Sequence, residues 1–159
     1  FQLVDDERDI KIVYLAKGIS AHDLVDRGWI EKKYEIPGDR YALFAMIRGD
    51  ASDGLPGVKG IGEKGAALIA RHFADANDAL EAAKREDERL TAALRKKIIE
   101  GQEYLSFAPK LVACATDVPL PKVDLKVPKR PKSLDEINSL KEQYGLGASV
   151  DRLISALNW

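Results

Sequence analysis

Two aspartates, Asp50 and Asp53, lie three residues apart in a segment, 49–62, that is rich in glycine, proline and aspartate. Across a tight turn their carboxylates can face one point, and both should be ionised near neutral pH. Carboxylates are hard oxygen ligands that suit Mg²⁺ or Mn²⁺, ions that keep water and substrate phosphate as further ligands. The alternative is structural, because aspartates in turns also accept hydrogen bonds from backbone N–H groups, here with the help of Ser52.

A glycine-rich hairpin, 57–62, follows the aspartates and leads directly into a predicted helix that begins at Glu63. Glycine allows a phosphate to approach the backbone closely, and the unpaired N–H groups of a helix N-terminus favour negative charge. Such a cradle suits a nucleic-acid backbone and implies binding that weakens as salt is added. A tight turn without a ligand is the alternative. The candidate DNA-binding residues are Gly57, Lys59, Gly60, Gly62 and Lys64.

None of three other ligand-binding loop motifs matches this segment in full. Gly60, Gly62 and Gly65 match the dinucleotide-binding pattern, but no buried strand precedes them and the residues that follow are predicted to be helical. A Walker A loop requires adjacent glycine and lysine, which Glu63 separates. A calcium-binding EF-hand loop would require a glutamate where Ile61 stands. Binding of ATP or calcium through these motifs is therefore rejected. A dinucleotide-binding oxidoreductase is a third, disfavoured hypothesis, and we expect calorimetry to show no binding of NAD(P).

The overall composition is that of an ordinary soluble globular protein, with 45% hydrophobic and 32% charged residues among 159. No apolar run approaches the ~20 residues that a membrane span requires. Because the net charge is −1, any affinity for nucleic acid must come from a local patch. One cysteine and two distant histidines supply neither an internal disulfide nor a usual zinc site. The cysteine, Cys114, lies in an apolar run and is expected in the core.

Hydrophobic periodicity and capping signals predict a mostly helical protein with a few short strands. Strands are expected over 11–15 and 111–116, and helices over 37–49, from 63 onward, over 77–84, 90–105 and 133–144, and from 149 to the C-terminus. The basic positions 95–97 should lie on a solvated helix face, and the prolines and lysines of 119–132 predict an extended basic connector. The aromatic residues expected in the core are Trp29, Phe44, Phe73 and Phe107.

The segment 49–64 resembles a known signature. It reads GDASDGLPGVKGIGEK and is similar to the G-D-x-S-D-N-x-P-G-V-x-G-I-G-x-K motif of the bacterial 5′ nucleases, a family of flap endonucleases and polymerase I 5′-exonuclease domains. Gly54 stands where the family usually has asparagine, and Gly65 where it has threonine. The resemblance covers residues 1–125 approximately, with further similar stretches at 1–6, 17–18 and 34–37.

The resemblance implies the C-terminal part of an α/β, PIN-like 5′-nuclease domain joined to a helix-hairpin-helix (H3TH) subdomain. It implies that Asp50 and Asp53 are ligands of one of two divalent metal ions, Mg²⁺ or Mn²⁺. It also implies that the hairpin grips duplex DNA and that the backbone carbonyls of Val58 and Ile61 hold a K⁺ beside a DNA phosphate. The expected parts are the edge of the nuclease core, the helix-hairpin-helix subdomain, a strand with the basic connector, and a C-terminal helical pair, at 1–36, 37–106, 107–132 and 133–159.

Two functions stay open at this point. The first is the C-terminal part of a structure-specific 5′ nuclease that hydrolyses phosphodiesters in duplex DNA with a 5′ flap or 5′ end. The family's main carboxylate cluster would precede Phe1, so we expect a piece of a longer protein that is inactive alone. The second is a non-catalytic helix-hairpin-helix module that only binds duplex DNA. The paired carboxylates favour the nuclease, because they would repel phosphate unless a cation lay between. We also expect a monomer in the bacterial cytoplasm, associated with the nucleoid and with no membrane contact.

Overall fold

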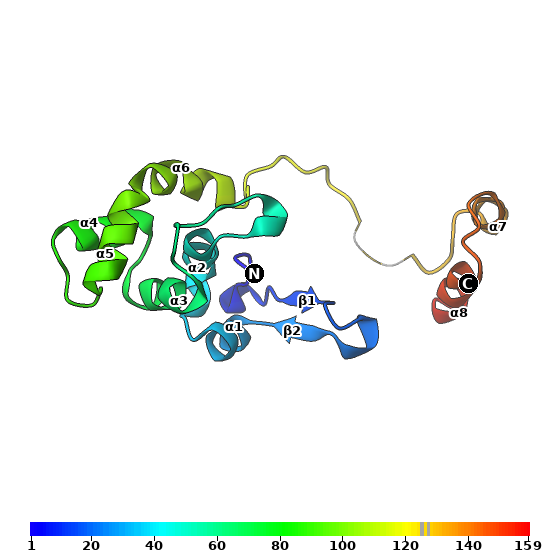
Figure 1. Cartoon of the computed structure of the whole chain (residues 1–159). Helices are drawn as coiled ribbons and strands as arrows, with labels where there is room; N and C mark the ends of the chain where they lie inside the picture. Colours follow the sequence, from blue (N-terminus) through cyan, green and yellow to red (C-terminus); the bar gives the residue numbers. More distant parts are fainter. Residues whose placement is uncertain (125, 127) are drawn as a thin grey trace. The chain divides into compact units, whose positions relative to one another are not determined.

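The computed structural model describes residues 1–124, 126 and 128–159; Leu125 and Val127, which fall within the expected basic connector, lie outside the described residues. The chain divides into two compact units, Phe1–Thr116 and Asp117–Trp159. The described residues are mostly helical, as the sequence predicts, and contain one pair of short strands, of which the second was not predicted (Figure 1).

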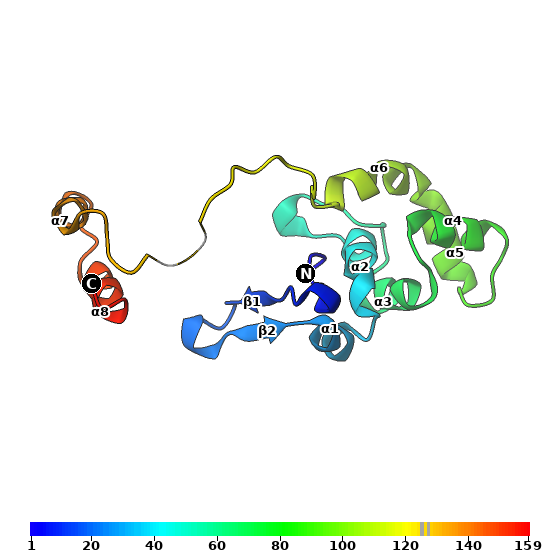
Figure 2. The same cartoon turned by 180° about the vertical axis from the view of Figure 1, so that it is seen from behind.

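The first unit begins with a small antiparallel hairpin. Strand β1 (Ile12–Tyr14) pairs with β2 (Asp23–Val25), which confirms the strand predicted at 11–15. A hairpin with strands of only three residues is not stable alone, so it depends on packing against neighbouring elements. Here the ring of Tyr14 in β1 makes edge-on contacts with Phe1 and Trp29, at 5.1 and 6.2 Å between centroids. Trp29 belongs to helix α1 (Arg27–Tyr34), and both views place the two strands beside this helix (Figures 1 and 2).

Helices α2 and α3 form the centre of the first unit. Helix α2 (Tyr41–Arg48) is preceded by a short 3-10 helix (Gly38–Arg40) and confirms the helix predicted up to Gly49. Helix α3 (Glu63–His72) begins at the predicted residue. It buries mostly alanines, whose small side chains allow it to pack closely against α2. The two helices therefore provide a rigid frame for the loop that connects them, which carries the aspartates and the hairpin.

Helices α4 (Ala76–Lys84), α5 (Ala92–Glu100) and α6 (Gln102–Val112) complete the first unit. The single helix predicted over 90–105 is wrong, because the chain changes direction at Gly101. A Cβ at this glycine would lie 2.9 Å from Cγ1 of Val58, so the helix junction packs directly on the hairpin. Periodicity within 90–105 could not reveal this break, since both helices keep apolar residues at helical spacing.

The strand predicted over 111–116 is also wrong. Leu111 and Val112 are the last residues of α6, and 113–116 has no regular structure. Cys114 is exposed and does not belong to the core. Phe107 is 46% exposed on α6, so its assignment to the core is wrong as well. A short apolar run near a helix end has the composition of a buried strand, and only the packing partners distinguish the two.

The core of the first unit is formed by aliphatic and aromatic side chains from the N-terminal segment, from β2, and from α1 to α6 with their connecting segments; Phe44 and Phe73 are buried in it, as expected. Trp29 packs against this core and is partly buried. The largest fully buried side chains are Phe44, Phe73, Ile30, Ile36, Ile47, Ile69, Leu90, Ile98 and Val25.

The second unit contains helices α7 (Leu134–Gln143) and α8 (Ala148–Ala156). The hydroxyl of Ser133 accepts a hydrogen bond from the N–H of Glu136 at 3.1 Å, which confirms the predicted helix start. No described residue of this unit is buried, and an ion pair between Lys141 and Asp151 (2.6 Å) links the two helices. Among the helices that the structure describes, none has the length and apolar character needed to cross a lipid bilayer.

Candidate functional site

Asp50 and Asp53 lie on one turn, at the two ends of a short 3-10 helix. Asp50 caps this helix (Ala51–Asp53), and its Oδ1 accepts hydrogen bonds from the N–H of Ser52 at 3.1 Å and from the Ser52 hydroxyl at 2.6 Å. Two backbone hydrogen bonds between Asp50 and Leu55, each 2.9 Å, close the loop. The Asx turn weighed as the structural alternative is therefore present at Asp50. The side chain of Asp53 is exposed.

Arg48 is the basic residue that forms an ion pair with Asp50, and the sequence reasoning missed it. Its Nη2 lies 3.8 Å from Oδ2 of Asp50, while its Nε donates to the carbonyl of Gly49 at 3.2 Å and its guanidinium stacks on Phe44. The hydrogen bonds from Ser52, with a smaller contribution from Arg48, hold the pKa of Asp50 below its ordinary value. The Asp50 carboxylate is therefore a permanent anion at neutral pH.

The two aspartates offer carboxylate oxygens on one turn, the ligand type that a hard divalent cation prefers. Asp50 is ionised, Asp53 is exposed, and Asp50 lines a shallow hollow of about 380 Å³ together with Arg48, Gly54 and Pro56. Among the described residues, no group of three or more His, Cys, Asp or Glu side chains could hold a metal ion. A cation at this turn would need water, phosphate or groups from outside the described residues as its other ligands.

The hairpin 57–62 is anchored by two buried side chains. Val58 and Ile61 are 3% and 4% exposed, and the N–H of Ile61 donates to the carbonyl of Val58 at 2.9 Å. The N–H of Val58 in turn donates to the carbonyl of Ile47 at the end of α2, also at 2.9 Å. Lys59 and Gly60, between these anchors, are exposed. The tip of the predicted hairpin, Lys59 and Gly60, is therefore exposed to solvent, while buried side chains on both sides fix its position.

Lys97 also contacts the hairpin, although the sequence places it on a solvated helix face. Its Nζ donates to the carbonyl of Gly60 at 2.6 Å, across 37 positions of sequence. The K⁺ expected on the carbonyls of Val58 and Ile61 stays a prediction. The Val58 carbonyl already accepts one hydrogen bond, which leaves one lone pair for a cation.

The N-terminus of α3 is open beside the hairpin. Gly62 is the capping residue, and no side chain caps this helix end. A Cβ at Gly62 would meet nothing within 4 Å, so the approach to the backbone is unobstructed. The first N–H groups of a helix lack partners within the helix, and they attract anions. Lys64 in the first turn is exposed, like Lys59, and neither forms an ion pair with a carboxylate in the part of the chain that the structure describes.

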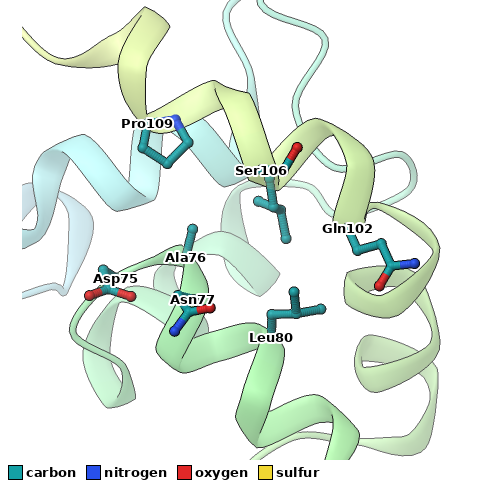
Figure 3. A pocket seen from close by; sticks show the side chains of 8 residues that line it. Asp75, Ala76, Asn77, Leu80, Gln102, Ser106 and Pro109 are labelled. Atoms are coloured by element: carbon teal, nitrogen blue, oxygen red, sulfur yellow. The ribbon is translucent and has the colours of Figure 1, made fainter.

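A further hollow of about 430 Å³ lies between α4 and α6 (Figure 3). It is bordered by Leu80, Gln102, Ser106 and Pro109, with Asp75 at one end. The Asp75 carboxylate caps α4 by accepting from the N–H of Asp78 at 2.9 Å, so it serves the helix. No second carboxylate, histidine or lysine lines this hollow, which makes it a poor candidate for hydrolytic chemistry.

Comparison with known proteins shows the family of the chain. The family model described as "5'-3' exonuclease, C-terminal SAM fold" matches residues 36–135, a range that includes both aspartates, the hairpin and Lys97. The chain belongs to this 5′-3′ exonuclease family. The mostly helical architecture of the described residues is consistent with a C-terminal helical domain of such proteins.

Individual relatives carry related names. A protein named 5'-3' exonuclease from Streptomyces coelicolor is 42% identical over 157 residues, which cover 99% of this chain and 52% of that protein. "DNA polymerase I, thermostable" from Thermus aquaticus is 37% identical over 84% of this chain and 16% of its own length. "Flap endonuclease Xni" from Pseudoalteromonas translucida is 32% identical over 60% of this chain and 35% of its own length. The chain thus spans about half the length of the Streptomyces protein.

Proposed function

We propose that this chain is the duplex-gripping C-terminal part of a metal-dependent 5′ nuclease, a 5′-3′ exonuclease or flap endonuclease that hydrolyses DNA phosphodiesters. The observation that carries the proposal is the hairpin 57–62. Its buried anchors Val58 and Ile61 hold exposed Lys59 and Gly60 beside the uncapped N-terminus of α3. This arrangement offers positive charge and free N–H groups, which are the groups that contact nucleic-acid phosphates.

In this proposal the hairpin binds the phosphates of duplex DNA that carries a 5′ flap or 5′ end. Gly60 and Gly62 are exposed and allow the backbone to come close, Gly57 packs against the end of α2 and supports the hairpin, and Lys59 and Lys64 supply point charges. A K⁺ on the carbonyls of Val58 and Ile61 would add to this positive charge. Each neutralised phosphate releases counterions, so duplex binding should weaken steeply as salt is added. The parent protein would act as a monomer on the nucleoid in the bacterial cytoplasm.

We further propose that Asp50 and Asp53 hold a divalent ion, Mg²⁺ or Mn²⁺, at the edge of the phosphate cradle. Such an ion would activate water and stabilise charge at the phosphodiester. Ser52 fixes one oxygen of Asp50, and Arg48 offsets part of the negative charge of the pair. Two carboxylates cannot complete a set of metal ligands, so the proposal requires further carboxylates from a longer protein. This chain alone would bind duplex DNA without cutting it.

A non-catalytic duplex-binding module is the second candidate. It is favoured by one specific observation, the engagement of Asp50 with Ser52 in an Asx turn, which gives this aspartate a purely structural use. The two candidates make opposite predictions for removal of the carboxylate charge. Asp50→Asn together with Asp53→Asn should strengthen duplex binding by a module, because a repulsive charge is lost. In a nuclease the same change should abolish cleavage.

The test is cleavage of a 5′-labelled flap duplex in Mg²⁺ or Mn²⁺. The chain would be assayed alone and joined to the part of the Streptomyces coelicolor 5′-3′ exonuclease that it does not match, with thermal unfolding to confirm that the chimera folds. We expect the chimera to cut and the chain alone to bind only. Asp53→Asn should stop cleavage by the chimera, whereas the matched change at an exposed connector position, Asp117→Asn, should not. A folded chimera that binds duplex but never cuts, or an Asp53→Asn form that still cuts, would contradict the metal-site proposal.

A further inference from the structure

Residues on one side of helix α5 and at its C-terminal end contact the hairpin and the start of α3. Leu94, Lys97 and Gly101 lie three and four positions apart, so they share a side of the helix axis. A Cβ on Gly65 would lie 3.3 Å from Cδ2 of Leu94, and one on Gly101 would lie 2.9 Å from Cγ1 of Val58. Lys97 contributes the polar contact of this face, through its hydrogen bond to the hairpin carbonyl. Helix α5 is therefore part of the structure that presents the hairpin.

The side chain of Lys97 lies flat over Gly60. A Cβ at Gly60 would be 3.2 Å from Cε and 3.6 Å from Cδ of this lysine, and the lysine is half-buried. Its ammonium donates to the Gly60 carbonyl at 2.6 Å, which uses one of three N–H donors. Within the described ranges, Lys97 forms no ion pair with a carboxylate. A full positive charge is thus fixed on the hairpin with two donors uncommitted.

The two preceding basic residues are used differently. Lys96 is exposed and lies 3.8 Å from the carboxylate of Glu100. Arg95 donates to the backbone carbonyls of Glu86 and Asp87, at 3.0 and 3.2 Å, and so closes the loop between α4 and α5. Of the three consecutive cations, only Lys97 has its charge placed on the hairpin among the contacts that the structure describes.

We propose that Lys97 is a phosphate-binding residue of the duplex interface, tethered to the hairpin by the Gly60 carbonyl. The inference rests on the proposed binding of duplex DNA by the hairpin, and it extends that interface onto a helix, α5, that lies outside the hairpin motif. The tether favours DNA binding because a lysine loses side-chain entropy when a phosphate immobilises it. For Lys97 part of that loss has already occurred on folding. Lys97 then adds a third cation to those of Lys59 and Lys64.

The test is a salt titration of duplex binding by the 159-residue chain and its Lys97→Gln, Lys97→Arg and Lys96→Gln forms, with a blunt DNA duplex as the probe. The slope of log K against log[salt] decreases in magnitude by about 0.9 for each lost phosphate contact. At 0.1 M salt one such contact corresponds to a factor of about 8 in affinity. We expect Lys97→Gln to show both changes, and Lys97→Arg and Lys96→Gln to keep the original slope. Thermal unfolding of each form verifies that the fold is retained.

The results of the salt titration distinguish failure of the role of Lys97 from failure of the proposed function. Weaker binding by Lys97→Gln with an unchanged slope would mean that the lysine only supports the hairpin, and this would overturn the proposal. An equal loss of slope in Lys96→Gln would assign the effect to general charge and overturn it as well. If the unsubstituted chain shows no salt-dependent binding to duplex DNA, both the role of Lys97 and the proposed function fail. If it binds and Lys97→Gln binds equally well at every salt concentration, only the role of Lys97 fails.

Discussion

Two glycines of the same loop, Gly54 and Gly57, provide a matched test of how the hairpin is attached to α2. Both have positive φ, +70° and +68°, where a residue with a Cβ is strained by about 1–2 kcal/mol. They differ in their surroundings. A Cβ on Gly54 would meet nothing within 4 Å, whereas a Cβ on Gly57 would lie 2.6 Å from the carbonyl oxygen of Arg48 and 2.7 Å from the backbone nitrogen of Gly49.

The free energy of unfolding should reflect this difference. For Gly54→Ala the conformational strain is the whole effect, about 1–2 kcal/mol. For Gly57→Ala the backbone must also move, and overpacking adds about 1–3 kcal/mol, which gives roughly 2–5 kcal/mol in total. The gain from a less flexible unfolded chain is similar at both positions and cancels in the comparison. Gly57→Ala should therefore have the lower free energy of unfolding by roughly 1–3 kcal/mol.

The assay is urea and thermal unfolding followed by circular dichroism, combined with duplex binding. The difference in stability corresponds to a melting temperature that is lower by roughly 3–10 °C in Gly57→Ala than in Gly54→Ala. Because the displaced backbone belongs to the hairpin, Gly57→Ala should also lose duplex affinity, which Gly54→Ala should keep. Equal melting temperatures for the two variants would refute the argument that the hairpin packs directly on the end of α2.

Three further outcomes follow from the packing of the first unit. Tyr104→Phe removes the hydrogen bond that the hydroxyl donates to the Met46 carbonyl at 3.0 Å and should lower the free energy of unfolding by about 1 kcal/mol in urea titration; no change would mean that water replaces it. Arg89 holds the pKa of Asp87 below its ordinary value of 3.8, so this carboxylate stabilises the fold above pH 4 and loses that effect as the pH falls further. The difference in melting temperature between the parent chain and Asp87→Asn should accordingly shrink below pH 4, and a constant difference would contradict this assignment. Phe44→Ala empties a fully buried site and should cost about 3–5 kcal/mol in the same titration, whereas a loss below 1 kcal/mol would contradict its place in the core.

The features that could be predicted from the sequence have causes that lie within a few residues of one another. The helix over Tyr41–Arg48 follows from its apolar spacing and the glycine after it, and the start of α7 follows from Ser133 and the Glu136 N–H. The aspartates and the hairpin were found in the same way, as a dense local pattern. Their roles in binding DNA and a metal ion stay predictions, while the family to which the pattern points is confirmed by the match over residues 36–135.

The errors arose where an element's identity depends on distant partners. The residues 111–116 have the apolar composition of a strand, yet no neighbouring strand is present among the described residues to pair with them, and α6 extends to Val112 instead. Phe107 and Cys114 were assigned to the core on composition, but nothing packs over them closely enough to exclude water. Periodicity also failed to show the break at Gly101. The side chain that packs against this glycine is Val58 of the hairpin, which lies more than forty positions earlier in the chain.

The sequence by itself determined the family, the helical character and the loop that carries paired carboxylates and a glycine hairpin, because these depend on local spacing and on residue types that few other structures require. Only the tertiary structure decided which charges belong to that loop. Arg48 reaches Asp50 because α2 ends beside the turn, and Lys97 reaches Gly60 because the chain at the end of α5, at Gly101, packs against Val58 of the hairpin. Electrostatic interactions act through space, so their partners are set by packing and not by position along the chain.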